Sequence, residues 1–404
     1  MHYIRLLRPP TLVKKPSREV TLSLVLTITT DLGDSFLAAE DPVPLSVLLQ
    51  TSSADGSGRM VVTLVDGSSP RQRQQCLWRA GLRVLKTDVL LPPQLASEML
   101  ASTESGKTHV LCIRAADPSV SASNTDIIIR GERALVMPIF FPFPSPLNHG
   151  DQHVATRRLQ LISGDNQALT IEVEEDIGES IARHVWDAGL VAVSLVADIL
   201  RRESSRGHGP LKEILSCVPS LNILELGTGV GIFGLGAAGT LETSRVSSVE
   251  EVNVLLTDLP DGEERATANI RRYEQTHSQD AEQSLRLRVG YENLDWEDGK
   301  QGVFGEQLRA RPWQLIVISD CTYNVDMLPA LVKTLSAIHA LQSGEGPTRV
   351  LLATKPRHPS EKALFDLMAY DEWTIKESST LPLPILGSVL QTVEVYLFGK
   401  DVRK

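Results

Sequence analysis

Residues 221–236, LNILELGTGVGIFGLG, constrain the fold of this chain more than any other segment. A run of apolar residues typical of a buried strand leads to Glu225, and four glycines follow within eight residues. Gly227, Gly229 and Gly231 allow a tight turn with positive φ and bring bare backbone close to a ligand. The segment therefore predicts a strand, a ligand-binding turn and a helix that packs closely on a sheet.

The rest of the chain after residue 221 alternates between strand and helix patterns. Strand patterns occur at residues 221–226, 252–258, 285–289, 313–319 and 349–354, and most are separated by helical patterns such as residues 325–341. This alternation is typical of a doubly wound, parallel α/β sheet. Residues 372–377 and 391–400 are two strand patterns without a helix between them. They predict an antiparallel hairpin at the end of the sheet.

The first 150 residues have a different pattern. Residues 19–29, EVTLSLVLTIT, alternate between apolar and polar side chains, and several similar runs follow between turn-forming segments. Such a pattern predicts half-buried strands of a β-rich domain. The segment 141–152 contains three prolines and resembles a linker. We therefore expect a β-rich domain at residues 1–150, suited to docking a partner or substrate, and an α/β domain at residues 151–404.

The composition limits the partners of the protein. The formal net charge is −10, whereas proteins that neutralise nucleic-acid phosphates usually carry excess Lys and Arg. No stretch approaches twenty uncharged apolar residues, and the first fifteen residues lack the apolar core of a signal peptide. We therefore expect no nucleic acid, no membrane and a monomeric protein of the cytoplasm, or of both cytoplasm and nucleus. No His, Cys or acid cluster has metal-ligand spacing, so no metal is expected.

Two cofactors compete for the glycine-rich turn. Residues 229–234, GVGIFG, satisfy the dinucleotide fingerprint G-x-G-x-x-G, which is a weak signal when it stands alone. Glu225 would repel a pyrophosphate, whereas S-adenosylmethionine has no phosphate and carries an ammonium and a sulfonium group. Asp258 ends the second strand of the expected sheet, where it could accept hydrogen bonds from ribose hydroxyls. The pattern favours S-adenosylmethionine.

Several motifs together resemble one family. The segments VWDAGLVA, LNILELGTGVGIFGLG, VLLTDLP, ENLDWED and LIVISDCTYNVDMLPAL occur in an order and spacing similar to the seven-β-strand protein-lysine methyltransferases of methyltransferase family sixteen. The resemblance covers roughly residues 159–398. It implies a seven-stranded Rossmann-like methyltransferase domain after the β-rich domain.

The resemblance also implies a cofactor site. Asp258 would hold the ribose, Glu225 would stand near the methionine moiety, and an indole at Trp296 could cover the adenine. Stacking of a base on an aromatic ring is worth roughly 1–3 kcal/mol. The implied cofactor-binding residues are Trp186, Glu225, Gly227, Gly229, Gly231, Asp258, Asp295 and Trp296.

The end of the fourth strand is the expected acceptor site. Residues 320–323, DCTY, match the D-x-x-Y pattern that the family uses for lysine, and the N-P-P-aromatic motif typical of enzymes acting on planar amines is absent. A lysine must be neutral to attack a methyl group, and its usual pKa is about 10.4. Asp320 and Tyr323 are therefore the candidate catalytic residues, which would position the amine.

We expect a protein-lysine N-methyltransferase that uses S-adenosylmethionine on a protein substrate. The resemblance implies elongation factors or chaperones as substrate classes. Two alternatives stay open: a small-molecule N- or O-methyltransferase, and a non-catalytic binding protein on a methyltransferase scaffold.

Overall fold

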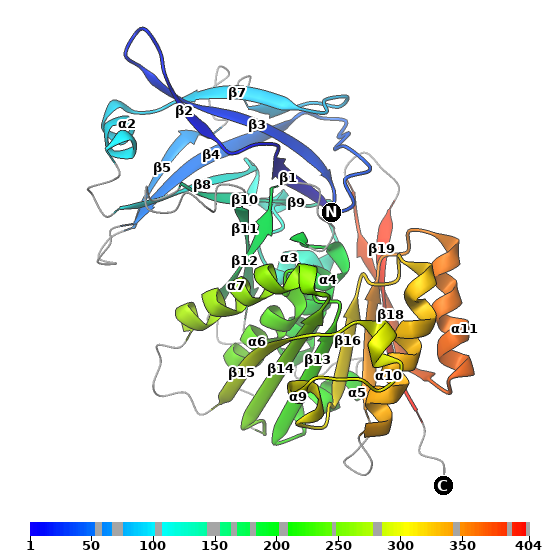
Figure 1. Ribbon diagram of the computed structural model, residues 1–404. Coiled ribbons are helices and arrows are strands. Elements are labelled where there is room, and N and C mark those ends of the chain that lie inside the picture. The colour runs from blue at the N-terminus through cyan, green and yellow to red at the C-terminus, as the bar shows by residue number, and fades with distance from the viewer. Residues whose placement is uncertain are drawn as a thin grey trace.

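The computed structural model describes residues 1–52, 59–66, 76–101, 107–143, 154–162, 168–177, 183–201, 209–244, 248–277, 285–341, 348–385 and 390–400. We call residues 1–177 the β-rich half and residues 183–400 the α/β half. Figure 1 shows the β-rich half above the α/β half, with the N-terminus at the junction between them.

The β-rich half contains two sheets. The first has the strand order β2-β3-β1-β9, with β7 also paired to β3. The second has the order β12-β11-β10-β8-β4-β5, with β6 paired to β4. The strands of the first sheet are β1 (His2–Leu6), β2 (Thr11–Lys14), β3 (Val20–Thr30), β7 (Leu85–Leu90) and β9 (Val136–Met137). Those of the second are β4 (Val43–Ser52), β5 (Arg59–Val65), β6 (Leu77–Trp78), β8 (Thr108–Ala115), β10 (Ile139–Phe143), β11 (Val154–Ile162) and β12 (Ala168–Asp176).

The two sheets share a core. Leu22 and Leu24 of β3 are buried in one cluster with Leu49 of β4 and Leu111 of β8. Two short helices, α2 (Pro93–Leu100) and α3 (Thr125–Arg130), connect strands of this half. The predicted β-rich N-terminal region is confirmed.

The second sheet continues past the expected domain boundary. Residues 150 and 151 and most of the expected linker lie outside the described residues, so the boundary stays a prediction. β11 nevertheless pairs with β10 at Phe140 and Thr156, and along its length with β12. Strand pairing therefore does not divide the chain at this point, because one sheet includes strands from both sides of it.

The α/β half is built on a third sheet of the order β15-β14-β13-β16-β17-β19-β18. The strands are β13 (Ser220–Leu226), β14 (Glu251–Asp258), β15 (Arg286–Asn293), β16 (Leu315–Ser319), β17 (Arg349–Thr354), β18 (Thr374–Leu383) and β19 (Gln391–Gly399). β13 to β17 pair in parallel, whereas β19 is antiparallel to both β17 and β18. The predicted doubly wound sheet and its final antiparallel hairpin are confirmed.

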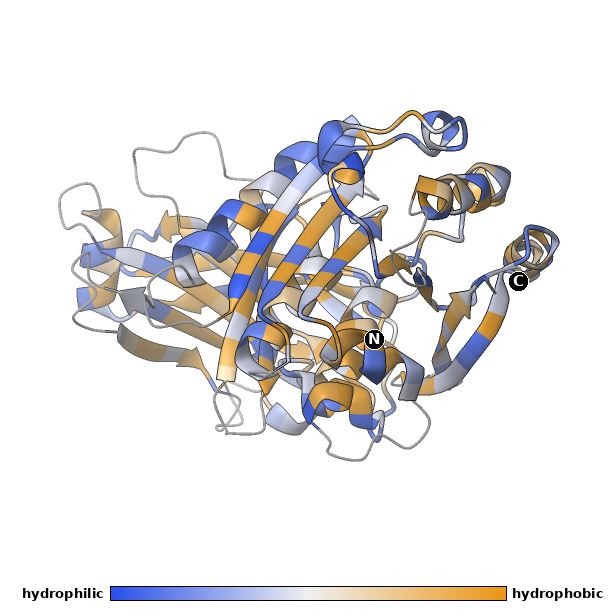
Figure 2. Ribbon diagram, turned by 90° about the horizontal axis from the view of Figure 1, so that it is seen from below, coloured by the Kyte–Doolittle hydropathy of each residue, from blue (hydrophilic) through white to orange (hydrophobic). Residues whose placement is uncertain are grey.

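Both faces of the third sheet are covered by apolar cores. Ile223 of β13 is buried in the cluster that includes side chains of α4 and α6, whereas its neighbour Leu224 belongs to the cluster that includes α10 and α11. Successive side chains of a strand point to opposite faces, so Ile223 and Leu224 enter different cores, and Figure 2 shows hydrophobic bands along the strands of the molecule. The helices of this half are α4 (Asp187–Arg201), α5 (Gly209–Ser216), α6 (Ile232–Ser244), α7 (Pro260–His277), α8 (Trp296–Gly299), α9 (Glu306–Arg309), α10 (Leu328–Leu341) and α11 (Ala363–Tyr370).

The core under α4 and α6 also receives side chains from the β-rich half. Leu159 of β11 and Ile171 of β12 are buried in it, and so is Tyr3 of β1. The two halves are therefore packed on a common interior. Within the described part of the chain, no helix has the length and apolar character needed to cross a membrane.

Candidate active site

The turn between β13 and α6 is built from bare backbone. Gly227, Gly229 and Gly231 have φ values of 68°, 55° and 83°, which confirms the positive φ predicted for the turn. A Cβ added at Gly227 would lie 2.5 Å from Cys321 Sγ and 3.4 Å from Trp296 Cζ2. A side chain at Gly227 therefore does not fit, because Cys321 and Trp296 pack directly against the backbone of the turn.

Glu225 lies buried beneath this turn, with an exposed fraction of 0%. Its Oε2 accepts hydrogen bonds from Thr228 Oγ1 at 2.7 Å and from the Gly234 N–H at 3.0 Å. Among the described residues, no group bonds to its buried Oε1. Burial raises the pKa of Glu225 to about 8. A buried oxygen without a partner needs a donor, so this position fits a ligand that carries an ammonium group.

Asp258 ends β14 beside the same turn. Its Oδ2 accepts from the Gly229 N–H at 2.7 Å, and its Oδ1 accepts from the Leu259 N–H at 2.8 Å. Burial raises the pKa of the carboxyl group. Each carboxylate oxygen can accept a further bond, so the predicted contact with ribose hydroxyls is compatible with these two bonds.

Asp295 and Trp296 follow β15. Asp295 caps α8, because its Oδ1 accepts from the Glu297 N–H at 2.9 Å. The Trp296 backbone oxygen accepts from Thr334 Oγ1 at 3.0 Å, and its half-buried indole lies next to Gly227. The structure thus brings Trp296 to the glycine turn, where adenine stacking was predicted, and gives Asp295 a structural contact.

Asp320 directly follows β16, in the left-handed region at a φ of 53°. Its Oδ2 accepts from the Ala188 N–H at 2.6 Å, and its Oδ1 is 2.7 Å from Arg357 Nη1. Burial raises the pKa of Asp320, although Arg357 opposes the shift. Tyr323, three residues later, is 56% exposed. The two candidate catalytic residues therefore differ: Asp320 is held in an ion pair, whereas Tyr323 faces solvent.

A cluster of buried charges surrounds Asp320, and the sequence pattern did not predict it. Lys355 Nζ lies 2.8 Å from Asp31 Oδ1 and 2.7 Å from Asp187 Oδ2. Arg357 bridges two carboxylates, with Nη2 at 2.7 Å from Asp31 and Nη1 at 2.7 Å from Asp320. We call Asp31, Asp187, Asp320, Lys355 and Arg357 the charge cluster. The sequence carried one sign of this cluster, because Asp320 and Lys355 each directly follow a run of mostly apolar residues.

The charge cluster also reaches two aromatic side chains. The Arg357 guanidinium carbon lies 5.2 Å from the ring centre of the half-buried Trp186, a cation–π distance. The Tyr3 hydroxyl donates to Asp187 Oδ1 at 2.7 Å, and the Met1 amino group lies 2.7 Å from Asp187 Oδ2. Burial alone would raise the pKa of Asp187, but the positive charges of Met1 and Lys355 outweigh it and lower the pKa.

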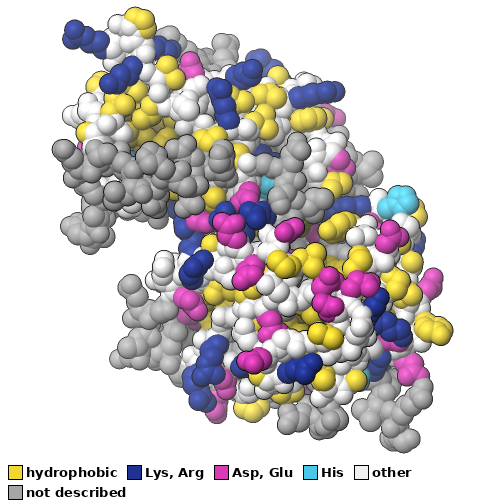
Figure 3. All heavy atoms as spheres, viewed as in Figure 1, with side chains coloured by type: hydrophobic (Ala, Val, Ile, Leu, Met, Phe, Trp, Pro, Cys, Tyr) yellow, Lys and Arg dark blue, Asp and Glu magenta, His cyan; other side chains and the backbone are white. Residues whose placement is uncertain are grey.

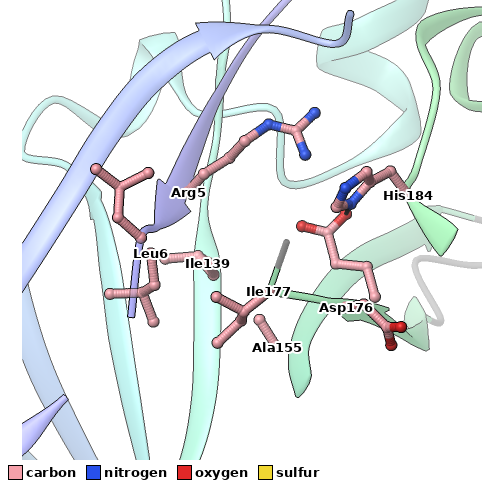
Figure 4. Close-up of a pocket in the computed structure, with 9 residues that line it drawn as sticks. Arg5, Leu6, Ile139, Ala155, Asp176, Ile177 and His184 are labelled. Atoms are coloured by element: carbon pink, nitrogen blue, oxygen red, sulfur yellow. Dashed lines mark ion pairs between the residues drawn. The ribbon is translucent and has the colours of Figure 1, made fainter. Parts of the chain in front are cut away.

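A separate pocket of about 280 Å³ lies at the junction of the two halves. Figure 4 shows Arg5 and His184 reaching its rim from opposite sides, with the apolar side chains of Leu6 and Ile139 below. His184 Nδ1 is 3.8 Å from Glu175 Oε2. None of the residues predicted for the cofactor or acceptor site lines this pocket. In the described part of the chain, no group of three or more His, Cys, Asp or Glu side chains could hold a metal ion.

Several known proteins are similar to this chain. A UPF0665 family protein of Schizosaccharomyces pombe is 26% identical over 213 residues, which cover 52% of this chain and 54% of that protein. The chain thus spans about half the length of the curated relative it matches. A methyltransferase structure from Methanosarcina mazei shares 12% identity over 46% of this chain and 94% of its own, with a TM-score of 0.31. The 1,6-didemethyltoxoflavin-N1-methyltransferase of Burkholderia thailandensis, solved with S-adenosylhomocysteine, shares 18% identity over 52% and 79%, with a TM-score of 0.31.

The third sheet and the glycine turn, with Asp258 at the end of the next strand, form the arrangement that was predicted for an S-adenosylmethionine site. The chain belongs to the lysine methyltransferase family, because the sequence model of that family matches residues 165–371, just over half of the chain. The expected family and cofactor are therefore confirmed.

Proposed function

We propose that this protein transfers a methyl group from S-adenosylmethionine to a lysine side chain of a protein substrate. The observation that carries the proposal is the exposure of Tyr323, which is 56% accessible at the end of β16. An exposed side chain at the predicted acceptor site supports access by a partner as large as a protein, whereas a metabolite enzyme would be expected to enclose its acceptor. Membership of the lysine methyltransferase family supports the same conclusion.

The site residues have distinct tasks in this proposal. The cofactor supplies an electrophilic methyl group. The glycine turn would hold the cofactor through backbone, Glu225 Oε1, which has no partner among the described residues, would accept from its amino group, and Asp258 would accept from its ribose. Trp296 covers one side of the turn next to Gly227. Together these contacts fix the orientation of the methyl group.

The acceptor lysine must lose its proton before its nitrogen can attack. In this proposal the Tyr323 hydroxyl positions the incoming amine, and Asp320, whose carboxylate is held by Arg357, contributes a negative charge to the acceptor site. Transfer of the lysine side chain from water into such a site favours its neutral amine form over the charged ammonium. Alignment of the nitrogen with the methyl group provides most of the acceleration.

A protein partner also suits the surface. The formal net charge is −10, and on the face seen in Figure 3 acidic and basic side chains are interspersed over the α/β half. A nucleic-acid substrate would call for a continuous basic patch.

Transfer of a labelled methyl group tests the proposal. We would incubate the protein and labelled S-adenosylmethionine with a cell lysate and separate protein, RNA and small molecules. The label is expected in the protein fraction, and protease treatment should release it from that fraction as small soluble peptides. Asp258→Ala, which removes the predicted ribose contact, serves as the inactive control. Label confined to the RNA or metabolite fraction would contradict the proposal.

A further inference from the structure

We propose that Asp31, in the β-rich half, is a positioning residue for methyl transfer that holds Arg357 and, through it, Asp320. The inference rests on the proposed function. It extends the acceptor site to a residue that lies far before Asp320 in the chain. The β-rich half then completes the acceptor site and is more than a docking module.

Asp31 reaches the third sheet from the turn that follows β3. Its side chain is 1% exposed, and its two oxygens are shared between two cations, with Oδ1 2.8 Å from Lys355 Nζ and Oδ2 2.7 Å from Arg357 Nη2. The Asp187 N–H, at the start of α4, also donates to Oδ2 at 3.3 Å. The carboxylate therefore connects β3, α4 and the segment after β17.

Arg357 is the link between Asp31 and the acceptor end. One guanidinium nitrogen donates to Asp31 and the other to Asp320, and the guanidinium plane lies over Trp186. A planar fork that serves two fixed carboxylates has little freedom to rotate. When Asp31 loses its charge, Asp320 is the carboxylate that still forms an ion pair with Arg357, so the guanidinium can turn toward Asp320 and shift its carboxylate.

The position of Lys355 depends on the same residue. Lys355 Nζ is shared by Asp31 and Asp187, while its backbone N–H points to Asp320 Oδ1 at 3.4 Å. Buried charges are tolerated only when they are paired. Loss of one carboxylate leaves both cations short of a partner, so the change spreads from the β-rich half to the end of β16.

Asp31→Asn tests the proposal, because it removes the charge at constant size. The probe is total lysate protein with labelled S-adenosylmethionine. Two quantities are measured for the variant and for the wild type: the initial transfer rate at saturating cofactor, and the cofactor concentration that gives half of this rate. We expect the rate to fall about 10- to 100-fold and the half-saturating concentration to change by less than about threefold. Calorimetry with S-adenosylhomocysteine should show a similarly small change.

Asp371→Asn is the matched control. Asp371 also holds two lysines, with Lys333 at 2.5 Å and Lys400 at 3.5 Å, but it lies after α11, away from the charge cluster. This variant should transfer at the wild-type rate. An equal loss of rate in both variants would show a general structural effect and would overturn the proposal, as would a wild-type rate for Asp31→Asn.

A double-mutant cycle with Arg357→Met tests the route of the effect. If Asp31 acts through Arg357, adding Asp31→Asn to Arg357→Met causes little further loss of transfer rate, and the losses of unfolding stability in urea are likewise smaller than additive. Independent, additive effects would contradict the proposal. The urea measurement needs no substrate, so it decides the coupling even if the wild type labels no lysine, a result that would count against the proposed function instead.

Arg357→Lys provides a second route if Asp31→Asn does not fold. It keeps the positive charge but cannot donate through a planar fork to both carboxylates. We expect the same 10- to 100-fold loss of transfer. A wild-type rate in this variant would contradict the positioning role.

Discussion

At the scale of single residues, Glu225 shows how the site depends on burial. An ionised carboxylate is costly in an apolar interior, and two hydrogen bonds to Oε2 offset only part of the cost, so the pKa of Glu225 rises from 4.5 to about 8. Between these values the folded protein keeps a proton that the unfolded chain has released. The contribution of Glu225 to stability is therefore present in full below pH 4.5 and is lost as the pH rises through about 8.

Glu225→Gln should remove this dependence. Relative to the wild type, we expect the free energy of unfolding of the variant to increase as the pH rises from 5 to 8 and then to level off, because only the wild type must ionise a buried group. Urea denaturation across this range measures the difference. Saturation with S-adenosylhomocysteine should reduce it, since an ammonium group near Oε1 favours the ionised form. A difference that does not vary with pH would show that Glu225 is ionised throughout.

Tyr323 offers a second test at this scale. Tyr323→Phe removes one hydroxyl from the acceptor end, so the transfer rate should fall about 3- to 10-fold, as expected for one lost hydrogen bond, while affinity for S-adenosylhomocysteine stays the same. Tyr370→Phe is the control, because Tyr370 is 84% exposed at the end of α11. Equal rates for Tyr323→Phe and the wild type would place the acceptor elsewhere.

At the scale of elements, the glycine turn was predictable because its pattern is local. Gly227 and Gly229 take the positive φ that their spacing indicated. Asp258 ends β14 and Trp296 follows the neighbouring strand β15, and both strands end at the same edge of a parallel sheet. The charge cluster was not predictable in this way. The contact between Asp31 and Lys355 joins residues 324 positions apart, and no periodicity encodes such a pairing.

Gly227→Ala tests the turn. The new Cβ would meet Cys321 Sγ at 2.5 Å and force a left-handed conformation that costs an L-residue roughly 1–2 kcal/mol. We expect a larger loss of unfolding stability than this and loss of S-adenosylhomocysteine binding by calorimetry. Gly302→Ala is the matched control, because Gly302 has a φ of 77° and no atom within 4 Å of the added Cβ. It should show the conformational cost alone and bind normally. Normal binding by Gly227→Ala would contradict the backbone cradle.

At the scale of the whole molecule, the two halves share structure. The second sheet includes β4 and β8 from early in the chain together with β12, and β12 packs against α6 and α7. The sequence could not predict that the second sheet continues across the expected linker. The hairpin after the linker, β11 and β12, would have the same alternating pattern whether it began a new domain or completed the sheet before it. Tyr3 and Ile171 lie in the core of the α/β half.

This arrangement predicts a single unfolding transition for the full chain. In urea, near-ultraviolet circular dichroism and loss of S-adenosylhomocysteine binding should give the same midpoint, because Tyr3, Leu159 and Ile171 of the β-rich half are buried in the core under α4 and α6. The 151–404 fragment, which lacks Asp31 and leaves β11 without β10, should be much less stable. Two separate midpoints, or wild-type cofactor affinity in the fragment, would show that the halves are independent.

The most direct measurement for the central proposal is mass spectrometry of the methylated product. Proteins that acquire the label from S-adenosylmethionine would be digested, and the modified side chain identified in the fragment spectra, with Asp258→Ala as the inactive control. The proposed chemistry predicts methyl groups on the Nζ of lysine, present with the wild type and absent with the control. Methyl groups on another side chain, or transfer to small molecules alone, would contradict it.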